Sequence, residues 1–196
     1  MKKILYITII LLYSISYSQQ LGEYYSNLDN NNNKESLNFG IKKPVDFKQR
    51  NLAQKDGLIE WQDENTKVEV FLTMIKKSNF KNLKKSEWTN LLKNKKHKFK
   101  FIKKSIYKKS EITYQTIDNF PSNLFSYSTE KTNNRILIVV VEDYYFRVNI
   151  SSSDVSLNFN NFVKNIINSI LFYDQYKDGK REVVGKWKVV KQTKPE

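Results

Sequence analysis

The 196-residue sequence contains no cysteine, a single histidine, three prolines and five glycines. Without cysteine the chain can form no disulfide, no thiolate metal site and no cysteine nucleophile. The glycines are not clustered, so the glycine-rich loops that hold phosphates in nucleotide-binding proteins are missing. A chain without disulfides depends on its hydrophobic core, and this chain is long enough to bury one core in a single domain.

The few groups that could carry catalysis are poorly placed. His97 stands between Lys96 and Lys98, whose charges disfavour its protonated form, and no carboxylate near it in sequence could orient it. The adjacent acids Glu142 and Asp143 are expected at a hairpin tip, where a turn explains them. We therefore expect no enzymatic activity, no cofactor and no metal site. The alternative of an extracytoplasmic hydrolase would require a concave site with converging acids.

Residues 1–18 have the pattern of a secretory signal peptide. Lys2 and Lys3 precede an apolar core of about a dozen residues, and small residues at 16 and 18 offer a cleavage site. No cysteine follows, which excludes lipoprotein attachment there. We expect an exported protein, periplasmic or extracellular, with no transmembrane segment after removal of the signal. An uncleaved N-terminal anchor is the alternative.

Lysine is concentrated in one segment. Fourteen lysines lie between Lys76 and Lys109, where Glu87 is the one acidic residue, and the formal net charge of the whole chain is +14. The remainder of the chain is therefore close to neutral. Asparagine, lysine, isoleucine and tyrosine are abundant, as AT-rich codons would produce, but codon bias alone would not confine the excess charge to one segment.

Apolar residues recur within this segment at regular spacings. Ser86 is the expected N-cap of a short helix, whose apolar stripe would comprise Trp88, Leu91 and Leu92. The alternation of lysine and phenylalanine over 98–101 predicts a strand with both phenylalanines on one face and both lysines on the other. A basic face over a buried aromatic row is the expected result.

This basic face predicts a binding surface for polyanions such as an acidic polymer or anionic lipid headgroups. The candidate contact residues are Lys93, Lys95, Lys96, Lys98, Lys100, Lys103 and Lys104. The alternatives are a solvated face without a ligand, and a contact with an acidic partner protein, as in an inhibitor or immunity-type factor. Sequence-specific nucleic-acid binding is not expected, because the alternation buries the phenylalanines and the segment has no arginine.

The remaining pattern predicts an α+β domain over 36–173, with an antiparallel sheet flanked by helices. Alternating apolar residues indicate strands near 37–41, 58–61, 68–75, 112–116 and 144–150. The β-branched run 135–141 is expected at the sheet centre, and 124–128 as an edge strand.

The two ends of this domain carry different signals. Asp154 is the expected cap of an amphipathic helix with apolar positions from Phe159 to Leu171. Residues 19–35 are expected to be a flexible polar lead-in. Residues 174–196 form a basic tail, in which one last short strand and a frayed terminus are the alternatives.

Three stretches carry a family resemblance. Residues 39–47 contain a strand pattern, a proline and an aromatic residue, 116–121 contain a turn before a proline, and 159–170 have the helical pattern. Together they resemble PsbP-like and DcrB-like domains over about residues 36–173. Phe47 stands where that family usually has tryptophan, and Asn119-Phe120 replaces its glycine before the proline.

The resemblance implies an α/β/α sandwich around an antiparallel sheet. It also implies an accessory or binding module outside the cytoplasm, usually without catalysis. It identifies no binding residue in this chain. The prediction of strands and two helices from the residues agrees with that architecture without depending on it.

Overall fold

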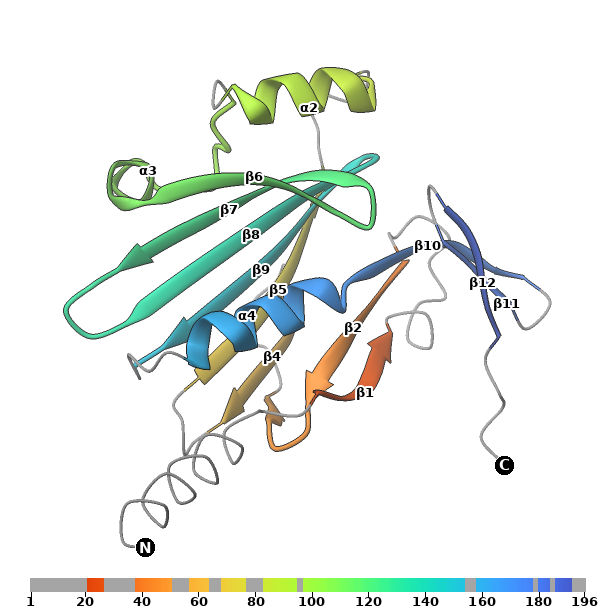
Figure 1. The fold of residues 1–196 in the computed structure, drawn as a ribbon, viewed down its shortest axis with the longest axis horizontal. Coiled ribbons are helices and arrows are strands. Elements are labelled where there is room, and N and C mark those ends of the chain that lie inside the picture. Colours follow the sequence, from red (N-terminus) through yellow and green to blue (C-terminus); the bar gives the residue numbers. More distant parts are fainter. Residues whose placement is uncertain are drawn as a thin grey trace, which may run out of the picture.

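Paired strands dominate the part of the chain that the computed structural model describes. The described residues are 21–26, 38–50, 57–63, 68–76, 83–94, 97–153, 158–177, 180–183 and 186–191. They form one domain with twelve strands in two antiparallel sheets and three helices (Figure 1). The proposed signal peptide and the expected cap residue Asp154 lie outside the described residues.

The larger sheet has seven strands in the order β3-β4-β5-β9-β8-β7-β6. Their bounds are Lys48–Arg50 for β3, Gly57–Asp63 for β4, Val68–Lys76 for β5, Glu111–Ile117 for β6, Phe120–Ser128 for β7, Asn133–Val141 for β8 and Tyr144–Ser152 for β9. Every neighbouring pair is antiparallel. The long-range pair β5 and β9 aligns Val68 with Ser152 and Lys76 with Tyr144, and thereby joins the two halves of the sheet.

The smaller sheet has the order β1-β2-β10-β11-β12. Its bounds are Leu21–Ser26 for β1, Asn38–Pro44 for β2, Leu171–Lys177 for β10, Lys180–Val183 for β11 and Lys186–Lys191 for β12. Strands β2 and β10 pair antiparallel through Phe39 and Phe172, so the first and last parts of the predicted 36–173 domain meet.

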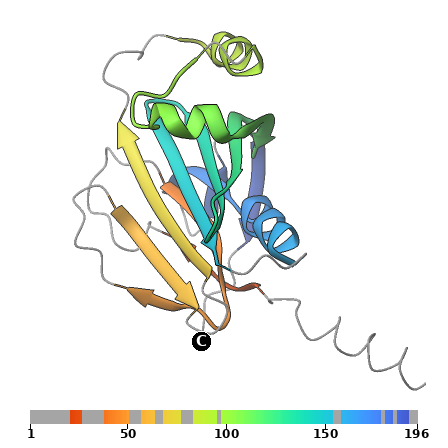
Figure 2. The same ribbon diagram turned by 90° about the vertical axis from the view of Figure 1, so that its left-hand side faces the viewer.

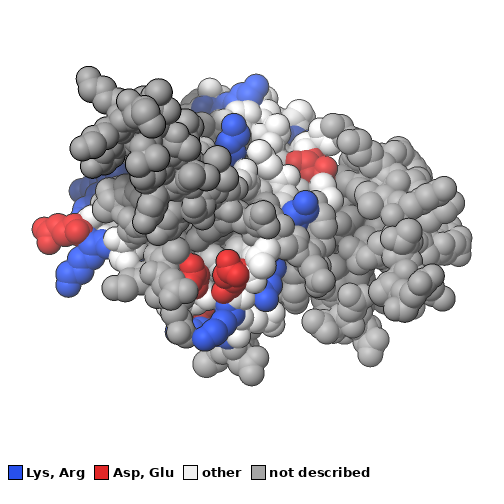
Figure 3. Space-filling view, turned by 60° about the horizontal axis from the view of Figure 1, so that its bottom comes forward, with Lys and Arg blue, Asp and Glu red and all other residues white. Residues whose placement is uncertain are grey.

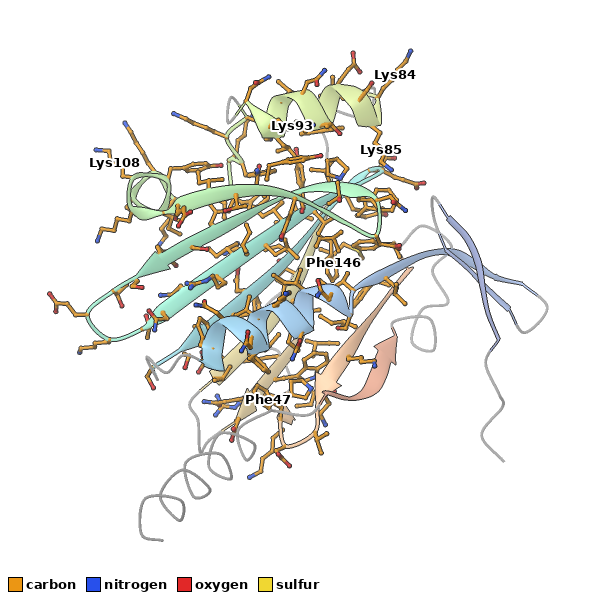
Figure 4. The ribbon with its side chains drawn as sticks, viewed as in Figure 1. Phe47, Lys84, Lys85, Lys93, Lys108 and Phe146 are labelled. Carbon is orange, nitrogen blue, oxygen red and sulfur yellow. The ribbon has the colours of Figure 1, made fainter. Side chains whose placement is uncertain are left out.

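The larger sheet buries apolar side chains on both faces. On the face that we call the inner face, helix α4 (Asn158–Asn168) packs together with β2 and β10. Phe146 of β9 lies 4.7 Å from Phe39 and 5.2 Å from Phe172 between ring centroids. Figure 4 shows Phe146 beneath this layer. The opposite or outer face carries helix α2 (Lys85–Lys93) and helix α3 (Lys104–Lys109), as Figure 2 shows.

Helix α4 confirms the amphipathic pattern read from the sequence from Phe159 to Ile167, but it ends at Asn168, and the last predicted position, Leu171, begins β10. Phe162, Val163, Ile166 and Ile167 are buried, whereas Lys164 faces solvent. Phe162 stacks on Phe47 of the opening motif with a centroid distance of 5.5 Å. Each buried side chain of this size contributes about 1.5 to 3 kcal/mol before conformational entropy is subtracted.

Two expectations about strands are wrong. Residues 124–128 belong to β7, which lies between β6 and β8 and is not an edge strand. Residues 98–101 form no strand and lie in the connection between α2 and α3. The run 135–141 does lie inside the sheet, in β8, and its hairpin with β9 is confirmed.

The ends of the chain are more regular than expected where they are described. Leu21–Ser26 forms β1, which pairs with β2, although 19–35 was expected to be a flexible lead-in. In the C-terminal region, β12 pairs with β11. The pairing of β10 with β11 extends the smaller sheet beyond residue 173.

The backbone angles explain which residues form the turn between β6 and β7. Ile117 pairs with Phe120, so Asp118 and Asn119 alone connect β6 and β7. Both have positive φ, at 46° and 67°, as a two-residue type I′ hairpin requires. Aspartate and asparagine tolerate this region better than most residues. Oδ2 of Asp118 also accepts the backbone N–H of Phe172 at 3.0 Å, which ties the turn to β10.

Candidate functional site

The lysine segment contains helix α2, whose N-cap is Lys84 rather than the predicted Ser86. The backbone N–H of Lys84 donates to Oε2 of Glu87 at 2.6 Å. The carbonyl of Lys84 accepts the backbone N–H groups of Glu87 and Trp88 at 3.0 and 3.1 Å. The carboxylate at the third helical position therefore fixes this end of the helix, and a serine cap is not used.

Two side chains attach α2 to the outer face of the sheet. Trp88 is 2% exposed and Leu92 is fully buried. The Trp88 ring meets Tyr145 of β9 edge to face, with centroids 5.8 Å apart. This packing sets the position of the lysines on the remaining faces of the helix.

The connection after α2 keeps the expected division between aromatic and basic side chains without being a strand. Phe99 is buried, whereas Lys98 and Lys100 are exposed. The backbone N–H of Phe99 donates to the Tyr107 hydroxyl at 2.6 Å, in place of a strand partner. The Phe99 ring lies 5.4 Å from Tyr145. This connection therefore buries Phe99 and exposes the neighbouring lysines on a backbone that is not a strand.

Nine exposed lysines of α2, α3 and their connection cover this part of the outer face. We call this set the lysine layer, and it comprises Lys84, Lys85, Lys93, Lys98, Lys100, Lys103, Lys104, Lys108 and Lys109. Five of the seven predicted contact residues belong to it. The other two, Lys95 and Lys96, lie outside the described residues. Figure 4 shows Lys84 projecting from one end of α2 and Lys108 from α3.

Two lysines of the layer lie against aromatic rings. Nζ of Lys85 is 5.0 Å from the centroid of Phe120, and Nζ of Lys93 is 5.4 Å from that of Tyr114. A cation on a ring at an exposed site contributes about 0.5 to 1 kcal/mol. These contacts hold part of the positive charge close to β6 and β7.

The described segment that carries the layer contains one acidic residue. Between residues 83 and 94 and between 97 and 110, the one acid is Glu87, whose carboxylate is bound to the Lys84 backbone. Figure 3 shows the molecule with the bottom of Figure 1 brought forward, and on that face acidic and basic side chains occur together among the described residues.

His97 is part of the packing beneath the layer. Its ring meets Trp88 and Phe99 edge to face, at centroid distances of 5.0 and 4.8 Å. Burial lowers the pKa of His97 below 6.5, which favours a neutral imidazole at pH 7. The ring therefore adds no positive charge to the surrounding lysines.

Further geometric features concern metal and membrane contacts. Among the described residues, no group of three histidine, cysteine or acidic side chains is placed to hold a metal ion. Within the same part of the chain, no helix has the length and apolar character needed to cross a bilayer.

A cavity on the outer face was not predicted from the sequence. Its volume is about 470 Å³, and it lies beside the lysine layer over β4, β5, β9 and β8, with Ile106 of α3 at its edge. Glu60, Glu69 and Arg147 line it. The polar residues of each alternating strand were visible in the sequence, but the sequence did not indicate that β5 pairs with β9.

Comparison with known proteins supports a PsbP-like fold. No protein-family model matches the chain, and no curated protein matches its sequence. The solution structure of cyanobacterial PsbP (CyanoP) from Synechocystis is similar with a TM-score of 0.50 and 7% identity, over 77% of this chain and 92% of that one. The similarity to CyanoP confirms the fold resemblance that the sequence motifs indicated.

Two other solved structures are more weakly similar. A Bacteroides thetaiotaomicron protein has a TM-score of 0.48 and 6% identity, over 71% of this chain and 46% of that one. LpqN, described as involved in cell envelope biogenesis of Mycobacterium tuberculosis, has a TM-score of 0.43 and 10% identity, over 76% of this chain and 90% of that one.

Proposed function

We propose that this protein is an exported, non-enzymatic accessory protein whose lysine layer binds an anionic polymer or lipid headgroups of the cell envelope. The export part of the proposal rests on the signal-like pattern of residues 1–18. The fold part rests on the PsbP-like architecture, which we interpret as an α/β/α sandwich in which β2 and β10 share the inner layer with α4.

The observation that carries the proposal is the one-sided charge of the layer. Nine exposed ammonium groups project from α2, α3 and their connection, and Trp88, Leu92 and Phe99 fix this backbone on the sheet. A positive field held in place attracts polyanions, and its strength falls as salt screens it. Flexible lysine side chains recognise charge more than shape, so we expect broad selectivity.

Two variants with equal charge change test the proposal. The layer variant replaces Lys98, Lys100 and Lys104 by glutamine. The control variant replaces Lys48, Lys131 and Lys164, which are exposed outside the layer, by glutamine. Both lose the same formal charge, so a difference between them reports position rather than net charge.

The measurement is the salt concentration that elutes each protein from a heparin column, together with sedimentation with phosphatidylglycerol vesicles. We expect the layer variant to elute at clearly lower salt than the control variant. The slope of log affinity against log salt should fall by about one for each lysine lost from the contact. Equal elution of the two variants, or no retention of the wild type at physiological salt, would contradict the proposal.

An acidic partner protein is the second candidate. The cation-ring contacts of Lys85 and Lys93 favour it in one respect, because they fix two charges in defined positions. A protein partner would require one binder of defined shape and would tolerate salt better than a diffuse polyanion contact. Strong salt dependence with several unrelated polyanions would reject it.

A further inference from the structure

The cavity on the outer face contains charges of both signs in separate places. Arg147 of β9 lies on the side that α3 borders, and Glu60 of β4 and Glu69 of β5 lie on the other side. The rest of the wall consists of neutral polar side chains such as Asn149, apolar side chains such as Phe71, and Arg135. The cavity thus differs from the lysine layer, which is positive throughout, and the inference below does not depend on the layer binding a polyanion.

Arg147 is a partly buried cation that has capacity for an anionic ligand. Its Nε donates to Oδ1 of Asn149 at 2.8 Å, and its guanidinium carbon lies 5.9 Å from the centroid of Phe101. No ion pair between Arg147 and a carboxylate occurs among the described residues. A guanidinium has five N–H donors, and one is used by Asn149, so a fork of donors is available for a carboxylate.

The electrostatic surroundings of Arg147 agree with this role. Burial lowers the pKa of Arg147, and the Tyr127 phenol opposes that shift. A guanidinium stays charged in proteins even when its pKa falls. Removing a cation from water without an opposite charge has a cost, which an anionic ligand would reduce.

The two glutamates lie together at the other side of the cavity. Glu60 pairs in register with Phe71, and Glu69 pairs with Gln62, so both carboxylates point to the outer face from adjacent strands. Nε2 of Gln62 donates to Oε1 of Glu69 at 3.3 Å. Both glutamate side chains are half-buried. Two carboxylates in this arrangement suit a ligand ammonium group.

The basic residues nearest these glutamates are occupied elsewhere or exposed. Arg50 of β3 stands opposite Glu60 in register, but its side chain is exposed at the sheet edge. Arg135 also lines the cavity, but it donates to the Asn134 carbonyl at 2.9 Å and to Oδ1 of Asn160 at 2.7 Å. Arg147 is therefore the cation best placed for a ligand.

Strand register gives the separation of the Cα atoms that carry the two charged ends. Glu60 aligns with Phe71, and Phe71 aligns with Asn149, which is two residues from Arg147. With about 4.8 Å between strands and about 3.4 Å per residue, the Cα atoms of Glu60 and Arg147 are about 12 Å apart. An extended peptide of three or four residues spans about 10 to 14 Å. Phe71 lies between the two ends and offers an apolar surface to the middle of such a chain.

We propose that this cavity binds a short peptide with free termini, with the peptide carboxylate on Arg147 and the peptide ammonium between Glu60 and Glu69. A polyanion would meet the two glutamates and be repelled. A ligand without negative charge would leave the Arg147 fork unused. A zwitterion of three or four residues satisfies both ends, and the volume of about 470 Å³ lies within the range of small-ligand sites.

Calorimetric titration of the full chain with tri-alanine and tetra-alanine tests the proposal. The matched probes are N-acetylated and C-amidated forms of the same peptides, which remove one charge each. We expect the free peptides to bind, and each blocked form to bind at least tenfold more weakly. Blocked forms that bind as well as free ones, or free peptides that show no binding at 10 mM, about the weakest range such titration reads, would overturn the proposal.

Variants assign each end of the peptide to its residue. In Arg147→Gln, amidation of the peptide should cost little further affinity, whereas acetylation should still cost tenfold. In Glu60→Gln the pattern should be reversed. Glu130→Gln and Lys131→Gln, exposed residues outside the cavity, should bind as wild type does. If amidation costs the same in Arg147→Gln as in wild type, the assignment is wrong.

Three controls exclude misfolding, a non-peptide ligand and an effect of the lysine layer. Circular dichroism shows whether Arg147→Gln is folded, and the blocked-peptide comparison on the wild type decides the matter if it is not. Galacturonic acid carries a carboxylate without an ammonium group, so tighter binding of galacturonic acid than of tri-alanine would reject a peptide ligand. The triple variant at Lys98, Lys100 and Lys104 should keep its peptide affinity, which separates this proposal from the polyanion proposal.

Discussion

Replacing Ser169 by alanine should weaken the attachment of α4 to the smaller sheet. Ser169 follows the last residue of α4 and is 6% exposed. Its Oγ accepts the backbone N–H of Lys42 in β2 at 3.0 Å and donates to the Ile166 carbonyl at 2.7 Å. One hydroxyl therefore joins residues that are 127 positions apart in the chain.

The magnitude follows from these two hydrogen bonds. A typical intramolecular hydrogen bond contributes about 0.5 to 1.5 kcal/mol, and removing one partner from a buried group costs about 1 to 3 kcal/mol. The carbonyl of Ile166 also accepts the backbone N–H of Ser169 at 3.1 Å, so it keeps a partner in the variant. The main loss is the acceptor for Lys42, and we expect a decrease of about 1 to 2 kcal/mol in the free energy of unfolding.

Urea unfolding measures this change. The control is Ser105→Ala, because Ser105 is exposed on α3 and its replacement should change stability by no more than about 0.5 kcal/mol. Hydrogen exchange gives a local readout, since the Lys42 amide should exchange faster in Ser169→Ala. A stability within 0.5 kcal/mol of wild type, about the control range, together with unchanged Lys42 exchange would refute the reasoning.

Three other predictions concern the helix start, the mid-domain turn and the single histidine. Ser86→Ala should change the free energy of unfolding by no more than about 0.5 kcal/mol from wild type, because Lys84 is the N-cap. A loss of about 1 kcal/mol in urea unfolding would instead indicate that Ser86 caps the helix. Asn119→Gly should be neutral or raise the melting temperature, because φ is 67° there, and a marked fall would show that the asparagine side chain matters. The pKa of His97 is lowered on folding, so the unfolded chain binds more protons. The contribution of His97 to the free energy of unfolding should be complete above pH 6.5 and be lost as pH falls below 6.5. In urea unfolding between pH 7.5 and 5.5, His97→Gln should therefore reduce the dependence of the free energy of unfolding on pH.

The spacing of apolar residues correctly predicted the helix and the strands that pack one apolar face against the core. Helix α4 and the hairpin of β8 and β9 follow the expected apolar positions closely, because each alternation or helical stripe matches a face of the core. The predicted edge position of 124–128 is wrong, because these residues belong to β7, between β6 and β8. Ser122 is fully buried, but its Oγ donates to the Gln115 carbonyl at 2.9 Å, so a central strand tolerates it.

The segment 98–101 shows a limit of alternation as evidence. A period of two reports which side chains are buried, and it does not report whether the backbone pairs with another strand. Here the Tyr107 hydroxyl accepts the Phe99 N–H, and the Ile102 N–H donates to the Phe99 carbonyl at 3.0 Å. Both backbone polar groups of Phe99 are therefore hydrogen-bonded without a strand partner. The division between Phe99 and its neighbouring lysines is nevertheless the one that alternation predicted.

The charged cavity depends on information that alternation does not contain. Glu60, Glu69 and Arg147 each occupy the polar side of an alternating strand, which alone predicts three solvated residues. They share one cavity because β5 pairs with β9 across a long sequence separation.

The lysine layer and the cavity are linked by one aromatic residue. Phe101 lies 5.3 Å from Tyr145 beneath the layer and 5.9 Å from the Arg147 guanidinium in the cavity. Ile106 of α3 packs with the aromatic cluster of the outer face and also borders the cavity. Helix α3, which carries lysines of the layer, therefore also borders the cavity through Ile106. Changes that detach α2 and α3 would alter both surfaces, whereas changes of exposed lysines would alter only the first.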